Sequence, residues 1–437
     1  MKRIENPIRE SWMDLLKRPT QSLADIEGTV ISIFKEVENE GDKALSKYTE
    51  KFDGVRLQNV EVSDKEITEA VQSISNELKE AIQFAKRNIE KFHQAQKTEI
   101  VALETVPGVK CWQEKRPIDK VGLYIPGGTA PLFSTILMLA IPATIAGCRE
   151  LVLCSPPNKE GKIHPAILYT ASLCGVTKIY KIGGIQAIAA MTFGTETVPS
   201  VYKIFGPGNQ FVTVAKQVAT KYGVAIDMPA GPSELLVVAD DTAEASFVAS
   251  DLLSQAEHGA DSQVILVSTS KEMLNAVAIE IEAQIVNLPR KAIAEKAMAN
   301  SKLVYVANEK TAMQLINEYA PEHFIICTSN NDYYSTNIRN AGSVFIGNYT
   351  PESAGDYASG TNHTLPTNGY AKQYSGVNLD SFMKSITFQQ ISEKGIQYIG
   401  GAIEVMAEAE GLYAHKNAVT LRLEKLSKQP LDKPISN

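Results

Sequence analysis

The stretch Leu253 to Gly259, which reads LSQAEHG, closes a predicted helix that begins near Thr242. Gln255 and His258 are three residues apart, so a helix places both side chains on one face. An amide oxygen beside an imidazole could hold a metal ion. The same pattern also suits an ordinary polar helix end, because the chain lacks the HExxH zinc motif. The pair indicates a metal site only if other parts of the chain supply further ligands.

Further candidates come from the few histidines of the chain. Four of the six follow carboxylates or end predicted elements: His258, His323 after Glu322, His363 after Asp356, and His415 after Glu410. Glu322 and His323 could provide a base and a second proton acceptor near neutral pH. His93, on a charged helix, and His164, a predicted helix cap, receive no role. A borderline set of nitrogen and oxygen ligands suitable for zinc is available from four residues: Gln255, His258, Asp356 and His415.

Three predicted strands end in glycine-rich turns: YIPGGTAP (124–131), IGGIQA (182–187) and FGPGNQF (205–211). Ligands of parallel sheets bind beyond the carboxyl ends of strands, where backbone N–H groups and helix N-termini face solvent. The last turn begins a GxGxxG fingerprint, but Phe211 replaces the third glycine, so the fingerprint fails. The turns therefore leave two alternatives open, a bound nucleotide or tight turns without a ligand.

Composition excludes several classes of protein. The 437 residues allow two core-forming domains, and the net charge of −7 without a basic cluster argues against nucleic-acid or anionic-membrane partners. The N-terminus is too charged for a signal peptide, and the most apolar segment, 132–148, reads as a buried helix. The five cysteines form no CxxC pair, which is typical of reduced thiols in a cytoplasmic protein.

The order of predicted elements indicates an α/β fold. Helical periodicity dominates to about Lys97, and short β-rich runs alternate with helices from Val121 onward. This alternation predicts parallel sheet with crossover helices. It restarts after Gln255 as a second unit, followed by a long polar loop that is typical of functional loops in enzymes. The last sixty residues are predicted to be mainly helical.

Seven motifs together resemble histidinol dehydrogenase over residues 25–420: VGLYIPGGTAPLFSTILMLAIPA, FGPGNQFVT, DMPAGPSE, ASDLLSQAEHG, APEH, SAGDYASGTNHTLPT and EGLYAH. The resemblance implies oxidation of L-histidinol to L-histidine in histidine biosynthesis. It implies two hydride transfers to NAD, histidinaldehyde as the intermediate, and one zinc ion per subunit. We therefore expect an oxidoreductase that uses NAD and zinc.

The resemblance also implies a role for each matched residue. Zinc ligands would be Gln255, His258, Asp356 and His415. NAD contacts would be Tyr124, Gln186 and Asn209. Glu322 and His323 would be catalytic, His323 as the base for the hydroxyl proton and Glu322 as the residue that activates water. Substrate contacts would be Ser233, His363 and Glu410, together with His323 and the zinc ligands.

The fold that the resemblance implies has two incomplete Rossmann-like parallel-sheet domains. The first would comprise 25–120 and 237–377 and carry most zinc and catalytic residues, whereas the second, 121–236, would bind NAD. An N-terminal arm (1–24) and a helical, domain-swapped C-terminal tail (378–437) would complete a homodimer. The tail would contribute to the active site of the partner subunit.

Two other functions compete with this interpretation. A zinc hydrolase could use a glutamate beside the metal to activate water, but it leaves the glycine-rich strand ends without a purpose. A zinc-stabilised binding protein would favour a closed shell of thiolates and imidazoles, unlike this oxygen-rich set. Formation of NADH from NAD and histidinol separates the three functions.

Overall fold

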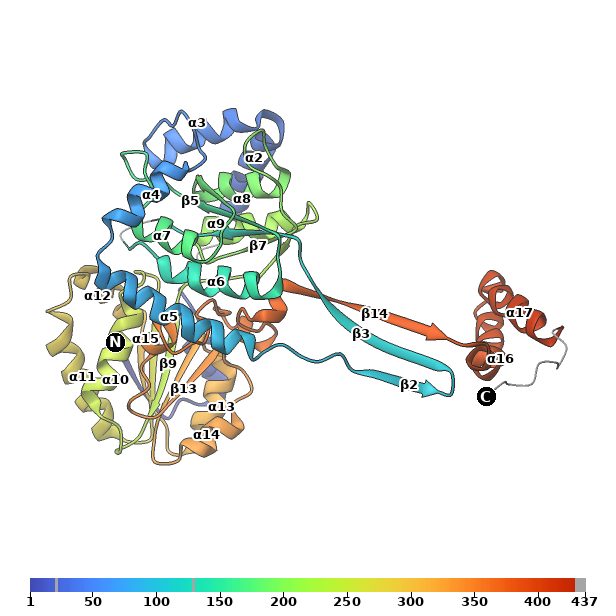
Figure 1. Ribbon diagram of the computed structural model, residues 1–437. Coiled ribbons are helices and arrows are strands. Elements are labelled where there is room, and N and C mark those ends of the chain that lie inside the picture. The colour runs from blue at the N-terminus through green and yellow to red at the C-terminus, as the bar shows by residue number, and fades with distance from the viewer. Residues whose placement is uncertain (20–22, 128–129, 429–437) are drawn as a thin grey trace. The chain divides into compact units, whose positions relative to one another are not determined.

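The computed structural model describes residues 1–19, 23–127 and 130–428. These residues form two compact units (Figure 1). The first unit contains residues 1–96 and 118–382, and the second contains 97–117 and 383–437. The fold is α/β, with two parallel sheets in the first unit and one antiparallel sheet in the second.

The glycine-rich part of the sequence forms a five-stranded parallel sheet in the order β6-β5-β4-β7-β8. Its strands are β4 (Lys120–Tyr124), β5 (Glu150–Ser155), β6 (Lys178–Lys181), β7 (Lys203–Phe205) and β8 (Ala225–Ile226). The intervening helices are α6 (Phe133–Ala146), α7 (Pro165–Leu173), α8 (Gly184–Phe193) and α9 (Gln210–Thr220). Counted along this segment, the strand order is 3-2-1-4-5, the first five strands of the dinucleotide-binding order 3-2-1-4-5-6.

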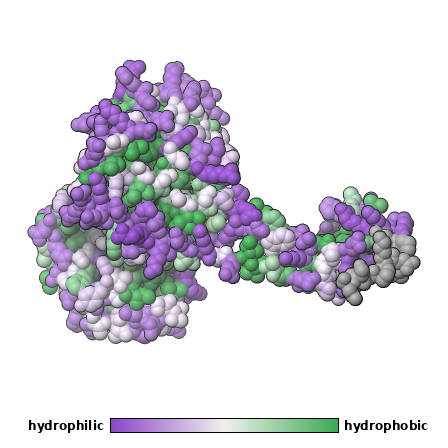
Figure 2. All heavy atoms as spheres, in the orientation of Figure 1, coloured by the Kyte–Doolittle hydropathy of each residue, from purple (hydrophilic) through white to green (hydrophobic). Residues whose placement is uncertain are grey.

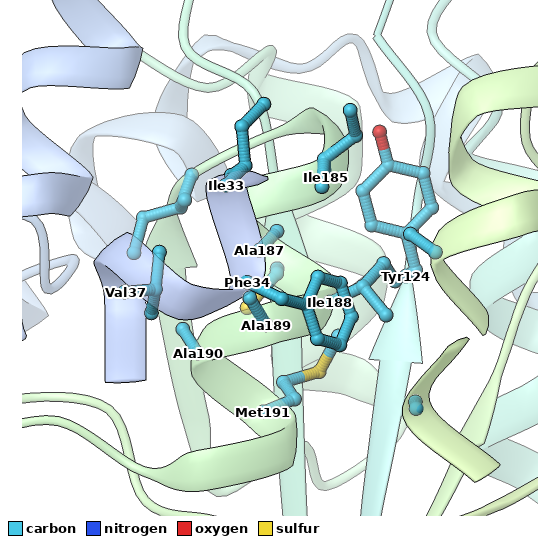
Figure 3. Close-up of a cluster of buried hydrophobic side chains, with 14 of the residues drawn as sticks. Ile33, Phe34, Val37, Tyr124, Ile185, Ala187, Ile188, Ala189, Ala190 and Met191 are labelled. Carbon is cyan, nitrogen blue, oxygen red and sulfur yellow. The ribbon is translucent and has the colours of Figure 1, made fainter. Parts of the chain in front are cut away.

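The helices that precede this sheet pack against it. They are α2 (Leu23–Glu40), α3 (Asp42–Asp53), α4 (Asp64–Ser73) and α5 (Asn76–Gln94). Helix α2 packs on α8 and α9, α4 packs on α7, and α5 packs on α6. Figure 3 shows Phe34 of α2 in the buried cluster that also contains Ile188 of α8 and Tyr124.

This packing corrects one expectation. We grouped 25–120 with 237–377, but the helices of 25–96 form their core with the glycine-rich sheet. Amphipathic periodicity shows which face of a helix is buried but not which sheet buries it. The remaining domain boundaries stay a prediction.

The second parallel sheet has six strands in the order β1-β11-β10-β9-β12-β13. Its strands are β1 (Lys2–Glu5), β9 (Glu234–Ala239), β10 (Gln263–Ser268), β11 (Lys302–Tyr305), β12 (His323–Cys327) and β13 (Ser343–Ile346). Strands β9 to β13 repeat the order 3-2-1-4-5. Alternate residues of β9 face two different cores, Leu235 and Val237 in one, Leu236 and Val238 in the other.

Helices cover both faces of this sheet. One layer contains α10 (Ala245–Ala256), α11 (Lys271–Ile285) and α12 (Lys291–Ala299). The other contains α1 (Trp12–Leu15), α13 (Glu309–Tyr319) and α14 (Asn331–Asn337). Shorter elements of the unit are a 3-10 turn at Arg9–Ser11, helix α15 (Glu352–Tyr357), and 3-10 turns at Tyr370–Lys372 and Leu379–Phe382. Among the described residues, no helix is both long and apolar enough to cross a lipid bilayer.

The first residues of the predicted N-terminal arm contribute to the six-stranded sheet, which the sequence did not predict. Strand β1 pairs with β11 at the edge of the six-stranded sheet, and Trp12 is buried in one of its cores. The strand has only four residues, KRIE, and none of them is fully buried. Its pairing depends on backbone hydrogen bonds, which leave no hydrophobic pattern in the sequence.

The described part of the predicted tail is mainly helical, as expected, but it also contains a strand that the sequence did not predict. Strands β2 (Ala102–Val106), β3 (Val109–Pro117) and β14 (Met383–Ile391) form an antiparallel sheet in the order β14-β3-β2. Helices α16 (Glu393–Ala409) and α17 (Tyr413–Ser427) pack on each other. The last nine residues of the predicted tail lie outside the described part of the chain.

Candidate active site

The predicted catalytic pair lies at the amino edge of the six-stranded sheet. His323 is the first residue of β12, Glu322 precedes it, and Glu234 is the first residue of the neighbouring strand β9. Because β9 and β10 are parallel, the connecting helix α10 must return toward this edge. Its C-terminal end therefore brings Gln255 to the two strand starts, although these residues are far apart in sequence.

His323 is buried among three carboxylates. Its Nδ1 lies 3.7 Å from Glu322 Oε2 and 3.9 Å from Glu352 Oε1, and its Nε2 lies 3.6 Å from Asp356 Oδ1. Burial opposes protonation of the ring, but the negative charges, with Glu352 first, raise the pKa of His323 well above its usual value. The surrounding carboxylates thus favour the protonated form of the imidazole.

Gln255 is completely buried, and its amide orientation follows from its neighbours. Its Nε2 donates to the backbone oxygen of Glu234 at 3.1 Å and to Glu322 Oε2 at 3.3 Å. Both partners are acceptors, so the amide nitrogen must face them. The side-chain oxygen then faces the other way and has no hydrogen-bond partner among the described residues.

Glu352 is a site residue that the sequence analysis missed. Its side chain is 1% exposed, and burial raises the pKa of Glu352 well above its usual value. It lies on α15 four residues before Asp356, a spacing that places both carboxylates on one helical face. That spacing was visible in TPESAGDY, but the segment was interpreted as a loop, where it has no such meaning.

The sequence analysis also missed an ion pair between Arg18 and Glu234, which holds the start of β9. Arg18 donates two hydrogen bonds to the carboxylate of Glu234, at 2.6 and 2.9 Å, and a third to the backbone oxygen of Tyr319. The paired side chains are 13% and 1% exposed. Burial still raises the pKa of Glu234 despite this guanidinium. The only sequence signal for Glu234 was its position as a charged residue at the start of an apolar strand.

The other predicted substrate residues of this unit lie close to the cluster. His363 Nδ1 is 3.0 Å from the backbone oxygen of Asp356, and its Nε2 is 3.1 Å from Thr135 Oγ1. Ser233 directly precedes Glu234 and is half-buried. His258 lies in the turn after α10, two residues beyond Ala256; it is exposed and interacts electrostatically with Asp356 and Glu322.

The cluster fits a divalent cation. His323, Glu352 and Asp356 have ligand atoms that all lie within 4.8 Å of one another. Four buried atoms of the cluster have no hydrogen-bond partner in the described part of the chain: Gln255 Oε1, His323 Nε2, Glu352 Oε2 and Asp356 Oδ1. Buried polar atoms rarely remain unsatisfied, and three of these are oxygens that only a donor or a cation satisfies.

The predicted nucleotide residues gather at the carboxyl edge of the five-stranded sheet. Tyr124 ends β4, and its hydroxyl accepts a hydrogen bond from Gly184 N–H at the start of α8. Gln186 is completely buried, and neither of its amide atoms has a partner within the described residues. Asn209 is exposed and caps α9 by accepting from Val212 N–H. Gly128 and Thr129, in the first glycine-rich turn, lie outside the described residues.

Gly206 directly follows β7 and lies very close to the backbone of Tyr124. Its φ is +131°, and a Cβ added there would lie 2.1 Å from the backbone oxygen of Tyr124. Strands β4 and β7 are the first and fourth of this sheet, where its strand order reverses. That point is where open α/β sheets bind their ligands.

The remaining two predicted site residues, Glu410 and His415, belong to the second unit. Glu410 follows α16, and His415 lies in the first turn of α17. Both are exposed within that unit.

Fold and site together define an α/β enzyme with a buried histidine–carboxylate centre and a separate glycine-rich sheet edge. The sequence profile of the family described as histidinol dehydrogenase matches residues 16–423. A histidinol dehydrogenase of Bacteroides thetaiotaomicron is 59% identical over 98% of this chain and 100% of its own length. One from Campylobacter jejuni is 53% identical over 94% of this chain and 96% of its own length.

The crystal structure of histidinol dehydrogenase from Elizabethkingia anophelis agrees over 98% of this chain and 99% of that chain, with a TM-score of 0.96 and 56% identity. The chain belongs to the histidinol dehydrogenase family. It is therefore an oxidoreductase of histidine biosynthesis.

Proposed function

We propose that the chain oxidises L-histidinol to L-histidine in two hydride transfers to NAD, with histidinaldehyde as the intermediate. The observation that carries this proposal is the burial of His323 among Glu322, Glu352 and Asp356 in a member of this family. The hydroxyl of an alcohol must lose its proton when hydride leaves the carbon. His323 is the base that we assign to this proton.

Zinc is the metal that we propose for the centre, held by Gln255, His258, Asp356 and His415 of the partner subunit. Gln255 Oε1 and Asp356 Oδ1, which have no hydrogen-bond partner among the described residues, support two of these ligands. His323 and Glu352 lie near Asp356 as well, but we assign them to proton transfer and to shaping the local charge. When bound, zinc would hold the amine and imidazole of histidinol, and its charge would favour the neutral form of His323 that a base requires.

The second oxidation needs water, because an aldehyde has no hydride to give until water adds to it. We assign the activation of this water to Glu322, whose Oε2 is held by Glu234 N–H at 2.8 Å and by Gln255 Nε2. A cysteine could instead hold the aldehyde as a thiohemiacetal. Cys327 ends the strand that His323 begins, so it lies at the opposite edge, and burial raises the pKa of Cys327 to about 12.

NAD is the cofactor that we place at the carboxyl edge of the five-stranded, Rossmann-like sheet, in contact with Tyr124, Gln186 and Asn209. The strand order 3-2-1-4-5 and the position of Gly206 at the reversal point support this placement. Gln186 adds an independent argument, because its buried amide has no partner among the residues that the structure describes, and a ligand or water would satisfy it. Burial raises the pKa of Tyr124 to about 12, which keeps its phenol neutral at the cofactor site.

A domain-swapped homodimer is the assembly that we propose. Large apolar residues are exposed on the surface of the second unit (Figure 2), and exposed apolar patches mark interaction surfaces. They include Ile386, Ile391, Tyr398, Val405, Met406, Leu412, Tyr413 and Leu421. In the dimer, Glu410 and His415 of each tail would complete the site of the other subunit. We also propose a cytoplasmic location, supported by five cysteines that form no disulfide.

The test of the activity is direct. Purified protein is mixed with zinc, NAD and L-histidinol, and the ultraviolet absorbance of NADH is followed. We expect two NADH per histidine formed, and loss of turnover after exhaustive chelation while the fold persists. A zinc hydrolase would form no NADH, and full activity of protein shown by elemental analysis to be metal-free would exclude the zinc assignment.

The shared site has its own test. Homodimers of Asp356→Ala and of His415→Ala should both be nearly inactive. In a refolded equal mixture, half of the dimers should be hybrids with one intact site each, so activity should recover to roughly a quarter of the unsubstituted level. If one chain supplied both ligands, every site of a hybrid would lack one of them, and verified hybrids would stay inactive.

A further inference from the structure

Helix α5 contains a buried histidine, His93, that the proposed reaction does not use. Its side chain is 0% exposed, and its Nδ1 lies 2.9 Å from the backbone oxygen of Ile89. A carbonyl oxygen only accepts, so Nδ1 must carry the hydrogen and Nε2 must offer a lone pair. That Nε2 lies 3.4 Å from Nδ2 of Asn362, which directly precedes His363. Burial also lowers the pKa of His93 and so favours this neutral ring.

Asn362 uses its whole side chain in this arrangement. Its Nδ2 donates to the backbone oxygen of Met138 on α6 at 2.6 Å as well as facing His93. Its Oδ1 accepts from Thr364 N–H at 2.9 Å, across His363. The residue is 7% exposed. Asn362 therefore joins the segment around His363 to two helices at once.

Two more contacts hold the same segment on α5. Asn88 donates from Nδ2 to the backbone oxygen of Ala358 at 2.8 Å. Gly360 has a φ of +116°, and a Cβ added there would lie 2.9 Å from the backbone oxygen of Asn88. The segment 358–364 follows α15, the helix of Asp356, and thus links the histidine–carboxylate centre to α5.

These contacts reach helices α5 and α6, which pack together beside the glycine-rich sheet. Helix α5 packs on α6, and α6 follows β4 and the first glycine-rich turn. Thr135 of α6 also contacts His363 directly. The bonds of His93 and Asn362 thus connect the proposed nucleotide side of the unit with its proton-transfer side.

We propose that His93 and Asn362 form a positioning pair that fixes the segment 358–364 on α5 and α6. The pair thereby sets the position of His363 and Asp356 relative to the bound nucleotide. This inference rests on the proposed function, since hydride transfer is the step that requires the two sides to be aligned. A displacement of about 1 Å between reacting groups can cost roughly 10²-fold in rate.

The test replaces the acceptor atom and then restores it. His93→Leu removes Nε2, whereas His93→Gln can place an amide oxygen near the same point. The matched control is Gln83→Leu on the same helix, which removes a hydrogen bond to Tyr169 of α7 and leaves the segment 358–364 untouched. Each variant is assayed as zinc-loaded protein for kcat, for KM of histidinol, and for NAD binding without histidinol.

We expect His93→Leu to lower kcat/KM for histidinol by roughly 10- to 100-fold with NAD affinity and zinc content unchanged. His93→Gln should recover most of that loss, and Gln83→Leu should change kcat/KM by less than about twofold. A purely structural role would lower the melting temperature of His93→Leu but leave its kcat/KM intact, and that outcome overturns the inference.

Asn362→Ala approaches the same bond from the other side and decides the matter if His93→Leu does not fold. It should reproduce the loss in kcat/KM, and an unchanged value would again overturn the inference. The unsubstituted protein separates the two levels of the proposal. If it forms no NADH from histidinol, the proposed function fails; if it does and the variants match it, only the positioning role fails.

Discussion

The two parallel sheets share the strand order 3-2-1-4-5, yet their candidate sites lie at opposite edges. In the five-stranded sheet, Tyr124 and Gly206 lie at the carboxyl ends of strands, as expected for this topology. In the six-stranded sheet, Glu234 and His323 lie at the amino ends. Strand order alone therefore does not determine which edge carries the chemistry.

The residues at the unused edge explain part of the difference. At the end of β9, Asp240 accepts hydrogen bonds from the backbone and hydroxyl of Ser329, at 2.8 and 2.7 Å, and from Thr242. Its backbone N–H also donates to the backbone oxygen of Cys327 at the end of β12. These bonds close the point where the six-stranded sheet reverses its order. In the other sheet, the equivalent region contains Gly206 and the amide of Gln186, which has no partner in the described part of the chain.

The two regions also differ in charge. The amino edge of the six-stranded sheet concentrates buried ionisable groups, including His323, Glu322 and Glu352. At the five-stranded sheet, the residues predicted to contact NAD are neutral: Tyr124, Gln186 and Asn209. Proton transfer needs groups whose pKa values the protein can shift, whereas a dinucleotide needs hydrogen-bond partners and room for close backbone approach.

Removal of the central imidazole should have the largest effect. We expect His323→Ala to lower kcat for histidinol oxidation by a factor of about 10²–10⁴, the usual cost of losing a positioned base.

Glu322→Gln should slow the aldehyde step more than the alcohol step, and single-turnover traces resolve the two steps. A Glu322→Gln enzyme impaired only in the alcohol step would reverse the roles that we assign.

A buried carboxyl group on α10, one of the helices that cover the six-stranded sheet, should also affect the stability of the protein. Burial raises the pKa of Asp251 on α10 to about 7, so the folded chain binds a proton more tightly than the unfolded chain does. Stability should therefore fall as pH rises from about 4 to about 7, by at most about 4 kcal/mol. Asp251→Asn should abolish this decline. Urea unfolding of zinc-free protein at pH 5 and pH 8 measures it, and equal pH dependence of both proteins would contradict the raised pKa.

A substitution that blocks the carboxyl edge of the five-stranded sheet should weaken NAD binding and leave the acid–base groups unchanged. In Gly206→Ala, the new Cβ collides with the backbone oxygen of Tyr124, and we expect KM for NAD to rise on the order of 10²-fold. Gly223→Ala is the control, because Gly223 also has a positive φ, +83°, but has open space around it. If both variants raise KM for NAD equally, the close approach at Gly206 is not what shapes the cofactor site.

The smallest effect on activity should come from a substitution at the carboxyl edge of the six-stranded sheet, which the hydrogen bonds of Asp240 close. Asp240→Ala removes an acceptor of several hydrogen bonds, and we expect a loss of about 1–3 kcal/mol in the free energy of unfolding. The kcat for histidinol should stay within about twofold, since the surface lies across the sheet from His323. A large fall in kcat with little change in stability would show that the carboxyl edge of this sheet takes part in the reaction.

Local spacing in the sequence was enough to find many of the important residues. Glu322 and His323 are adjacent in the chain, and the predicted helix is present as α10, which carries Gln255 but ends at Ala256, two residues before His258. Glycine-rich turns after apolar runs predicted the strand ends at Tyr124 and Gly206. These features depend on neighbours a few residues away, where helix and strand geometry determines relative position.

Only the tertiary structure decided how those local pieces meet. Arg18 and Glu234 pair across 216 residues, and Glu352 faces His323 only because α15 packs against α10. The pairing of β1 with β11 and of β14 with β3 uses backbone hydrogen bonds, which all residues except proline can both donate and accept. The sheet edge that carries His323 was likewise undecided by sequence, because strand order and local motifs permit either edge until the connecting helices return the chain to one of them.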